Sequence, residues 1–253
     1  MMTSAVIPWG DKIVLFGRDI SLQIADINIG ILYVFGVVSM GVYGIMIGSW
    51  ASNNKYSLLG GLRAASQIIS YELAMGISLI ALLMVTGTLS LKEMVVQQQN
   101  GNWNVFYQPL GFLIFLICSF AECNRTPFDL PEAESELIGG YHTEYSSMKL
   151  GFYLFSEYIN MFISSVIMAT LFFGGYDIPF LDESTLSPNI AAILGVLALM
   201  AKAVFFIFLF MWVRWTIPRF RYDQLMHLGW RIMIPLALFN MLVTGGVILY
   251  FNK

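Results

Sequence analysis

The chain has 253 residues, of which 58% are hydrophobic and only 11% are charged, and its net charge is −3. A soluble domain carries about 25% charged residues, so this composition leaves too few polar groups to cover a surface exposed to water. The small negative charge also argues against a nucleic-acid-binding protein. We therefore expect an integral membrane protein.

Six stretches are long and apolar enough to cross a bilayer, whose hydrocarbon core of about 30 Å needs roughly 20 residues in a helix. They are residues 29–50, 68–91, 103–121, 150–176, 190–213 and 232–251. The connections between them are short, the longest being 122–149. The predicted fold class is all-α, a polytopic membrane helical bundle of about six full transmembrane helices, forming one integral membrane domain over residues 1–253.

The basic residues predict the orientation, because Lys and Arg in short loops gather on the cytoplasmic side. Eight of them lie in the loops that follow the first, third and fifth spans: Lys55, Arg63, Arg125, Lys149, Arg214, Arg219, Arg221 and Arg231. The opposite side has four: Lys12, Arg18, Lys92 and Lys253. The side with eight is predicted to face the cytoplasm.

Three ionisable residues fall inside predicted spans, namely Glu72, Glu157 and Lys202. A charge at the bilayer centre costs on the order of 3 kcal/mol or more, so such residues usually face the interior of a bundle. They could belong to a proton path, or they could form structural ion pairs. Glu72 and Glu157 are expected near the cytoplasmic ends of their spans, whereas Lys202 is expected in mid-span, with a carboxylate as its partner.

The longest connection is unusually acidic and reads AECNRTPFDLPEAESELIGGYHTEYSSMKLG from residue 121. Its acids are Glu122, Asp129, Glu132, Glu134, Glu136 and Glu144. Glu132 and Glu136 would share one face of a helix. Two carboxylates at such a short distance raise each other's pKa toward neutrality, so that one can take up and release a proton, as a relay requires. A merely solvated acidic loop has the same composition, although the apolar residues between the acids favour a packed segment. Gly139 and Gly140 allow a sharp turn.

Metal ligands are scarce. Cys118 and Cys123 come without a second cysteine pair, and the chain has only His142 and His227. This is too few for a zinc or iron–sulfur site. We expect two small buried thiols, two hydrogen-bonding loop histidines and no metal.

Three segments carry a family resemblance: GGLRAASQIISYELAMG at 60–76, AECNRTPFDLPEAESELIGGYHTEYSSMKLGFYLFSEY at 121–158 and WVRWTIPRFRYDQLMHLGW at 212–230. With them the sequence resembles the H subunit of bacterial NADH:quinone oxidoreductase, respiratory complex I, the counterpart of mitochondrial subunit 1. The resemblance covers essentially the whole chain.

The resemblance implies an all-helical, multi-pass subunit of the bacterial inner membrane. Quinone would be its substrate, and the subunit would contribute to the quinone tunnel and couple quinone reduction to proton translocation. Its partners would be the quinone-module subunits of the peripheral arm, other membrane-arm subunits and lipids. NADH, FMN and the Fe–S clusters would be bound by partner subunits, because this chain carries no covalent cofactor and no G-x-G-x-x-G motif opening a βα unit.

The resemblance also implies roles for polar residues. The implied proton path, to which we add Lys202 for its mid-span position, comprises Glu72, Glu122, Asp129, Glu132, Glu134, Glu136, Glu144, Glu157 and Lys202. The implied support of the tunnel and loops comprises Arg63, Arg125, Arg214, Arg219, Arg221 and Asp223. The arginines of the last loop could alternatively bind lipid phosphates.

Members of the family have eight spans, and their first span and a following loop precede the part that TSAVIPWG at 3–10 resembles. The six stretches would then be spans three to eight. We expect a misplaced start, a fragment, or the remaining part on a separate chain.

Two other functions stay open. A homologous membrane subunit of a membrane-bound hydrogenase or related dehydrogenase would share the fold, and the co-purifying subunits would distinguish it. An independent secondary transporter would explain the charges inside the spans, but the sequence has no internal repeat with paired broken helices.

Overall fold

The structure, a computed structural model, describes residues 2–15, 17–130, 138–178 and 187–251. The chain divides into two compact units, each built from three separate stretches. Unit 1 comprises Met1–Val38, Thr86–Pro109 and Phe162–Phe208. Unit 2 comprises Ser39–Val85, Leu110–Met161 and Leu209–Lys253. That the chain is one integral membrane domain stays a prediction.

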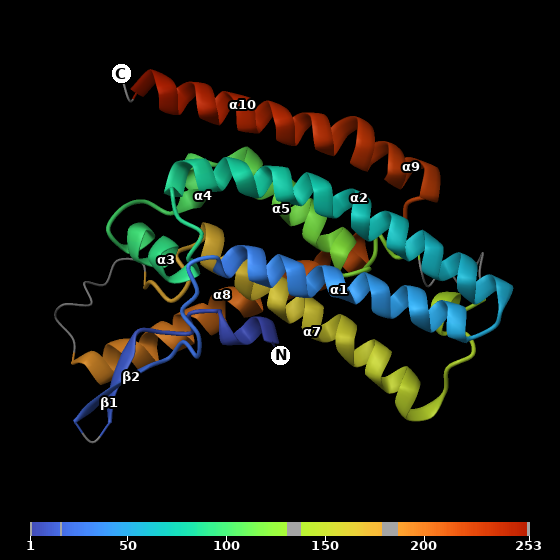
Figure 1. The fold of residues 1–253 in the computed structure, drawn as a ribbon, viewed down its shortest axis with the longest axis horizontal. Helices are drawn as coiled ribbons and strands as arrows, with labels where there is room; N and C mark the ends of the chain where they lie inside the picture. Colours follow the sequence, from blue (N-terminus) through green and yellow to red (C-terminus); the bar gives the residue numbers. More distant parts are fainter. Residues whose placement is uncertain (1, 16, 131–137, 179–186, 252–253) are drawn as a thin grey trace. The chain divides into compact units, whose positions relative to one another are not determined.

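Long apolar helices dominate both units (Figure 1). They are α1 (Gly30–Ala51), α2 (Lys55–Thr86), α7 (Ser147–Phe172), α8 (Pro188–Thr216) and the stretch Tyr222–Phe251, which joins α9 (Tyr222–His227), the π-helix η4 (Leu228–Met233) and α10 (Ile234–Phe251). Within the described ranges these five stretches are long and apolar enough to cross a membrane, and α5 (Pro109–Glu122) is a shorter apolar helix. The predicted all-α, polytopic membrane class is confirmed.

Helix α2 differs from the predicted span 68–91 at both ends. It begins at Lys55, because the residues before the apolar core include good helix formers such as Leu62, Arg63 and Ala64. It ends at Thr86, where Gly87 takes a positive φ of 69° and terminates the helix. Helix α3 (Leu91–Gln99) then starts separately.

The predicted span 103–121 is interrupted by a proline. Helix α4 (Asn104–Tyr107) ends at Gln108, whose φ of −133° and ψ of 59° are not helical. The residue before a proline is disfavoured in helical conformation, and Pro109 opens α5. With 14 residues α5 is about 21 Å long, which is shorter than a hydrocarbon core.

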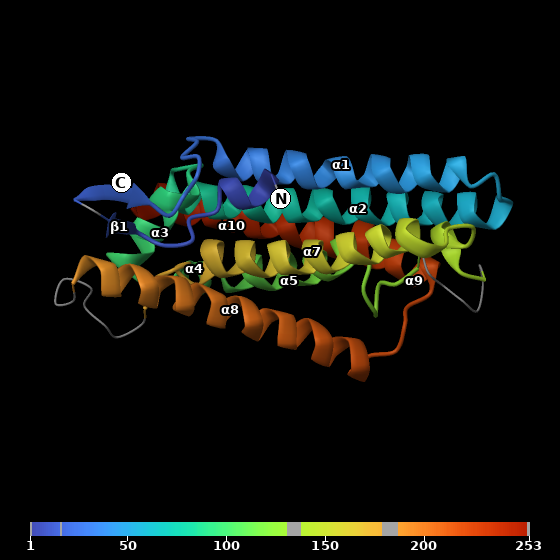
Figure 2. The same cartoon turned by 90° about the horizontal axis from the view of Figure 1, so that it is seen from below.

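Unit 1 contains a short 3-10 helix, η1 (Met2–Ala5), and a β-hairpin that the sequence did not predict. Strands β1 (Lys12–Leu15) and β2 (Arg18–Ser21) pair antiparallel, with Val14 opposite Asp19. The Asn189 side chain near the start of α8 accepts a hydrogen bond from Val14 N and donates one to Val14 O. The hairpin lies beside the start of α8 (Figure 2). Four-residue strands are too short to register in a search for 20-residue apolar stretches.

Unit 2 packs its helices through glycines on α2. A side chain on Gly60 would lie 2.9 Å from the backbone nitrogen of Tyr141, and one on Gly61 would overlap the Ser49 hydroxyl on α1. Small residues let helix backbones approach closely in a membrane, where packing is a main driving force for association. The two glycines therefore set how closely α1 and the 140–142 turn (η2, Gly140–His142) approach α2.

Candidate functional site

Arg125 and Glu157 form a buried ion pair in unit 2. Arg125, just beyond the end of α5, is 7% exposed, and Glu157 on α7 is 6% exposed. Guanidinium Nη2 lies 3.4 Å from carboxylate Oε2. The Tyr141 hydroxyl donates to Glu157 Oε1 at 2.7 Å, and Arg125 Cζ lies 4.5 Å from the centre of the Tyr158 ring. We call these four residues the Arg125 cluster. Its contacts offset part of the desolvation free energy of burying two charged groups.

The sequence identified Arg125 and Glu157 separately and did not predict that they pair. The ion pair left open for Glu157 is present. An ion pair does not exclude a role in proton transfer, since a carboxylate held by a hydroxyl and a guanidinium can still gain a proton when those contacts loosen.

Glu72 lies in the middle of α2 and not near an end, because the helix runs from Lys55 to Thr86. The Ser39 hydroxyl on α1 donates to its Oε1. Two residues before Glu72, Ser70 accepts a hydrogen bond from Trp230 Nε1 at 3.2 Å. Glu72 is thus a half-buried carboxylate between two long apolar helices.

Gln67 fastens the start of the acidic loop to α2. It is fully buried, and its Nε2 donates to Ala121 O at 2.9 Å, to Asn124 Oδ1 at 3.3 Å and to Phe128 O at 2.8 Å. This residue was not predicted from the sequence. The sequence signal for it was an amide on a helix face that it shares with Ala64, Tyr71 and Ala74, which are all buried.

The acidic loop also contacts the last predicted cytoplasmic loop. Arg219 Nη2 donates to Asp129 Oδ2 at 2.7 Å. Phe220 N donates to Pro127 O at 3.1 Å, and the Phe220 ring centre is 5.7 Å from that of Phe128. Two polar segments about 90 residues apart in sequence are therefore held together by an ion pair, a backbone hydrogen bond and a ring contact.

The other predicted residues lie around this core. Arg63 Cζ is 5.8 Å from the Tyr222 ring, and Glu144 Oε1 accepts from Asn54 Nδ2 at 2.7 Å. Arg221 and Asp223 form an exposed pair at 3.8 Å. Glu122 is the last residue of α5, and Arg214 lies in the last turn of α8. Glu132, Glu134 and Glu136 lie outside the described residues.

Lys202 belongs to unit 1. We predicted that Lys202 pairs with a carboxylate, and this is wrong, because its ammonium donates no hydrogen bond to a described carboxylate. All three go to backbone carbonyl oxygens, those of Phe173, Gly175 and Asp177. A lysine ammonium has three donors, so these bonds use all of them.

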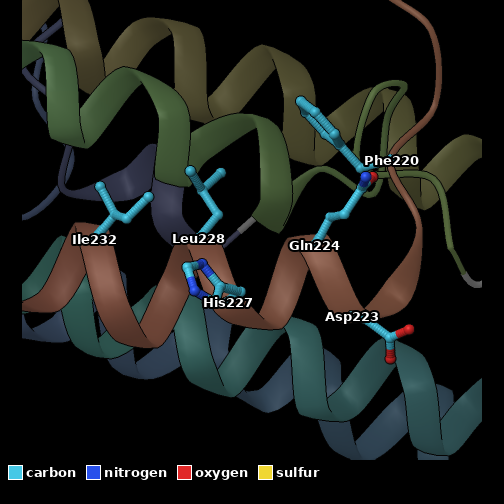
Figure 3. A pocket seen from close by; sticks show the side chains of 6 residues that line it. All are labelled: Phe220, Asp223, Gln224, His227, Leu228 and Ile232. Atoms are coloured by element: carbon cyan, nitrogen blue, oxygen red, sulfur yellow. The ribbon is translucent and has the colours of Figure 1, made fainter.

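A groove of about 460 Å³ follows the segment 220–232 (Figure 3). It is lined by Phe220, Asp223, Gln224, His227, Leu228 and Ile232. Among the described residues its lining comes from one continuous segment, so it runs along the surface of α9 and η4. His227 Nε2 lies 3.5 Å from Arg231 Nη1 one turn further on. The π-helix beside the groove is a rare conformation that often marks functional sites.

The two cysteines are buried, as expected. Among the residues that the structure describes, no group of three or more His, Cys, Asp or Glu side chains is arranged to hold a metal ion.

Comparison with known proteins identifies the family. The family model described as NADH dehydrogenase matches residues 1–245. The NADH-quinone oxidoreductase H subunit of Flavobacterium psychrophilum is 71% identical over 254 residues, which cover 100% of this chain and 74% of that protein. The corresponding H 1 subunit of Cytophaga hutchinsonii is 67% identical over 250 residues (99% and 73%), and the H subunit of Thermomicrobium roseum 50% over 256 residues (98% and 72%).

The chain belongs to the family of NADH-quinone oxidoreductase H subunits. The resemblance predicted from three motifs is thereby confirmed. In this member of the H subunit family the three motif segments, 60–76, 121–158 and 212–230, all fall in unit 2. Gln67 joins the first segment to the second, Arg219 joins the third to the second, and the pair of Arg125 and Glu157 lies within the second.

Proposed function

We propose that this chain helps form the quinone tunnel of an NADH:quinone oxidoreductase and couples quinone reduction to proton translocation. As a member of the H subunit family it is a membrane-embedded subunit of that enzyme complex, whose substrate is quinone. One observation supports the finer proposal: the three motif segments contact one another in unit 2 through Gln67 and Arg219, and the second of them holds the buried pair of Arg125 and Glu157.

In this proposal the carboxylates respond to a charge change at the quinone. Reduction to quinol takes two electrons, supplied by Fe–S clusters of partner subunits that receive them from NADH through FMN, and two protons. Negative charge developing near the acidic loop favours protonation of nearby carboxylates. The proposed path comprises Glu72, Glu122, Asp129, Glu132, Glu134, Glu136, Glu144 and Glu157.

The Arg125 cluster suggests how such a change is transmitted. A proton on Glu157 would weaken its attraction to the Arg125 guanidinium, 3.4 Å away. The loop that begins at Arg125 could then shift relative to α7. The proposed supporting residues, Arg63, Arg125, Arg214, Arg219, Arg221 and Asp223, would hold the remaining loops in place. Proton arrival and loop geometry would thereby be linked.

The coupling can be tested with Glu72→Gln and Glu136→Gln. Glutamine keeps the shape of the glutamate side chain, but its amide cannot take up and release a proton as a carboxylate does. We expect both variants to assemble and to lower the number of protons pumped per electron in membrane vesicles, measured beside NADH:quinone reductase activity. Glu93→Gln, at an exposed site on α3, is the matched control. Wild-type pumping and reductase rates in both variants would exclude the relay.

We further propose that the acidic and arginine-rich loops face the cytoplasm of a bacterial inner membrane, where the peripheral-arm subunits would bind. Arg221→Cys should then react with a membrane-impermeant thiol reagent from the cytoplasmic side only, and Lys12→Cys from the opposite side only. The native cysteines provide a low background, because Cys118 and Cys123 are at most 1% exposed. Labelling of position 221 from outside would overturn the orientation.

A further inference from the structure

The lysine in the middle of α8 is surrounded by acceptors from the end of α7. Lys202 Nζ lies 2.7 Å from Phe173 O, 2.9 Å from Gly175 O and 2.6 Å from Asp177 O. The Trp103 ring lies beside the same ammonium, with its centre 5.1 Å from Nζ. All of these residues belong to unit 1.

The three carbonyls lie in the turn that follows α7, beyond its last residue Phe172. They are therefore outside the hydrogen-bond ladder of the helix, next to the end that carries the negative pole of its dipole. Beyond Phe172 the chain turns through Gly174 and Gly175, whose φ angles are 74° and 56°. This turn directs alternate carbonyls toward Lys202, because the positive φ values are conformations that glycine adopts without strain.

Amide side chains occupy the neighbouring carbonyls. Gln98 Nε2 donates to Thr170 O at 3.1 Å, and Asn104 Nδ2 donates to Leu171 O at 2.8 Å. Unpaired backbone groups are costly in a membrane. The amides of α3 and α4 therefore bind carbonyls in the last turn of α7. The ammonium of α8 binds the carbonyls of the turn that follows.

Trp103 is itself fixed in place. Its Nε1 donates to Asp177 Oδ2 at 3.1 Å, so the ring is tied to the residue whose backbone carbonyl binds the lysine. An aromatic face attracts a cation through its quadrupole. The ammonium thus meets three carbonyl dipoles and one ring face, which is a cation-binding environment.

We propose that the carbonyls of Phe173, Gly175 and Asp177, together with the Trp103 ring, form a binding site for a small primary ammonium ion, which Lys202 occupies as a tethered cation. Lys202 then positions the end of α7 and lies outside the proton path to which the sequence assigned it. The inference depends on the contacts within unit 1 and not on the proposed path through unit 2.

Chemical rescue of Lys202→Ala in the assembled enzyme complex tests this. The change removes the three outer methylenes and the ammonium, a fragment that n-propylammonium reproduces. Leaving three acceptors without their charged donor should speed thermal inactivation of NADH:quinone reductase in membranes by at least about tenfold. We expect n-propylammonium to restore most of the loss. 1-Propanol lacks the charge and tetramethylammonium lacks N–H donors, so neither should restore it.

Several outcomes would overturn the proposal: an unchanged inactivation rate in Lys202→Ala, a loss that n-propylammonium does not relieve, or equal relief by 1-propanol. Protons pumped per electron, measured before heating, should stay at the wild-type value; a decrease would return Lys202 to the proton path. That ratio keeps this test separate from the test of Glu72 and Glu136.

Trp103→Leu keeps the test decisive if Lys202→Ala does not assemble. It retains the lysine and all three carbonyls and removes the ring together with its hydrogen bond to Asp177. Loss of the cation–π contact should speed inactivation roughly 2- to 5-fold. Trp103→Phe, which keeps a ring face but not the bond to Asp177, should fall between the wild type and Trp103→Leu. A wild-type rate in Trp103→Leu would overturn the role of the ring.

Discussion

Arg125→Met should accumulate little assembled complex and lose most NADH:quinone reductase activity. The change removes the guanidinium beside a carboxylate that is only 6% exposed. Breaking a buried pair by removing one partner costs about 3–5 kcal/mol, because the other charge stays buried. That is a large part of a typical folding stability of about 5–15 kcal/mol. Complex content on native gels and the rate of thermal inactivation measure the effect.

A double variant separates the pair from its individual members. Arg125→Met combined with Glu157→Leu leaves no buried charge at this site, so it should be more stable than Arg125→Met alone. Arg18→Met is the control for losing any arginine, since Arg18 is exposed on β2 and its replacement should change stability little. Wild-type assembly of Arg125→Met would contradict the expectation.

Hydropathy predicted the membrane class and the approximate spans, because burial in lipid imposes a composition that is visible over 20 residues. The ends of the helices depended on single residues instead. Gly87 ends α2 through a positive φ, and Pro109 divides the third predicted span. Gly140, one of the two glycines expected to allow a turn, does adopt a positive φ of 66°.

The pairing of the charges could not be predicted in the same way. Arg125 and Glu157 are 32 residues apart, and their contact depends on how the loop after α5 meets α7. Their charge and their position along the chain therefore identified both residues, but did not predict that they form an ion pair. Lys202 illustrates the opposite error, because a search for a carboxylate partner overlooks backbone carbonyls, which every residue carries and which the turn after α7 presents to this ammonium.

The glycines of α2 provide the second large effect. Gly61→Ala should destabilise the complex by about 1–3 kcal/mol, the usual cost of overpacking a core, because the new methyl group would overlap Ser49 on α1. Gly60→Ala should be at least as harmful, since its nearest neighbours are backbone atoms of Gly140 and Tyr141 at 2.9–3.1 Å, which cannot rotate away. Native-gel content and thermal inactivation again report the change.

Two variants make the test specific to packing. Gly76→Ala lies on the same helix with nothing within 4 Å of the new methyl group, so it should be neutral or slightly stabilising through better helix propensity. Ser49→Gly combined with Gly61→Ala removes the side chain that the methyl group would meet, and it should recover part of the loss. If Gly61→Ala resembled Gly76→Ala, or if the double variant recovered nothing, the close approach of α1 and α2 at Gly61 would be wrong. Recovery would show that these two positions share one volume, which neither residue reveals when the sequence is examined one position at a time.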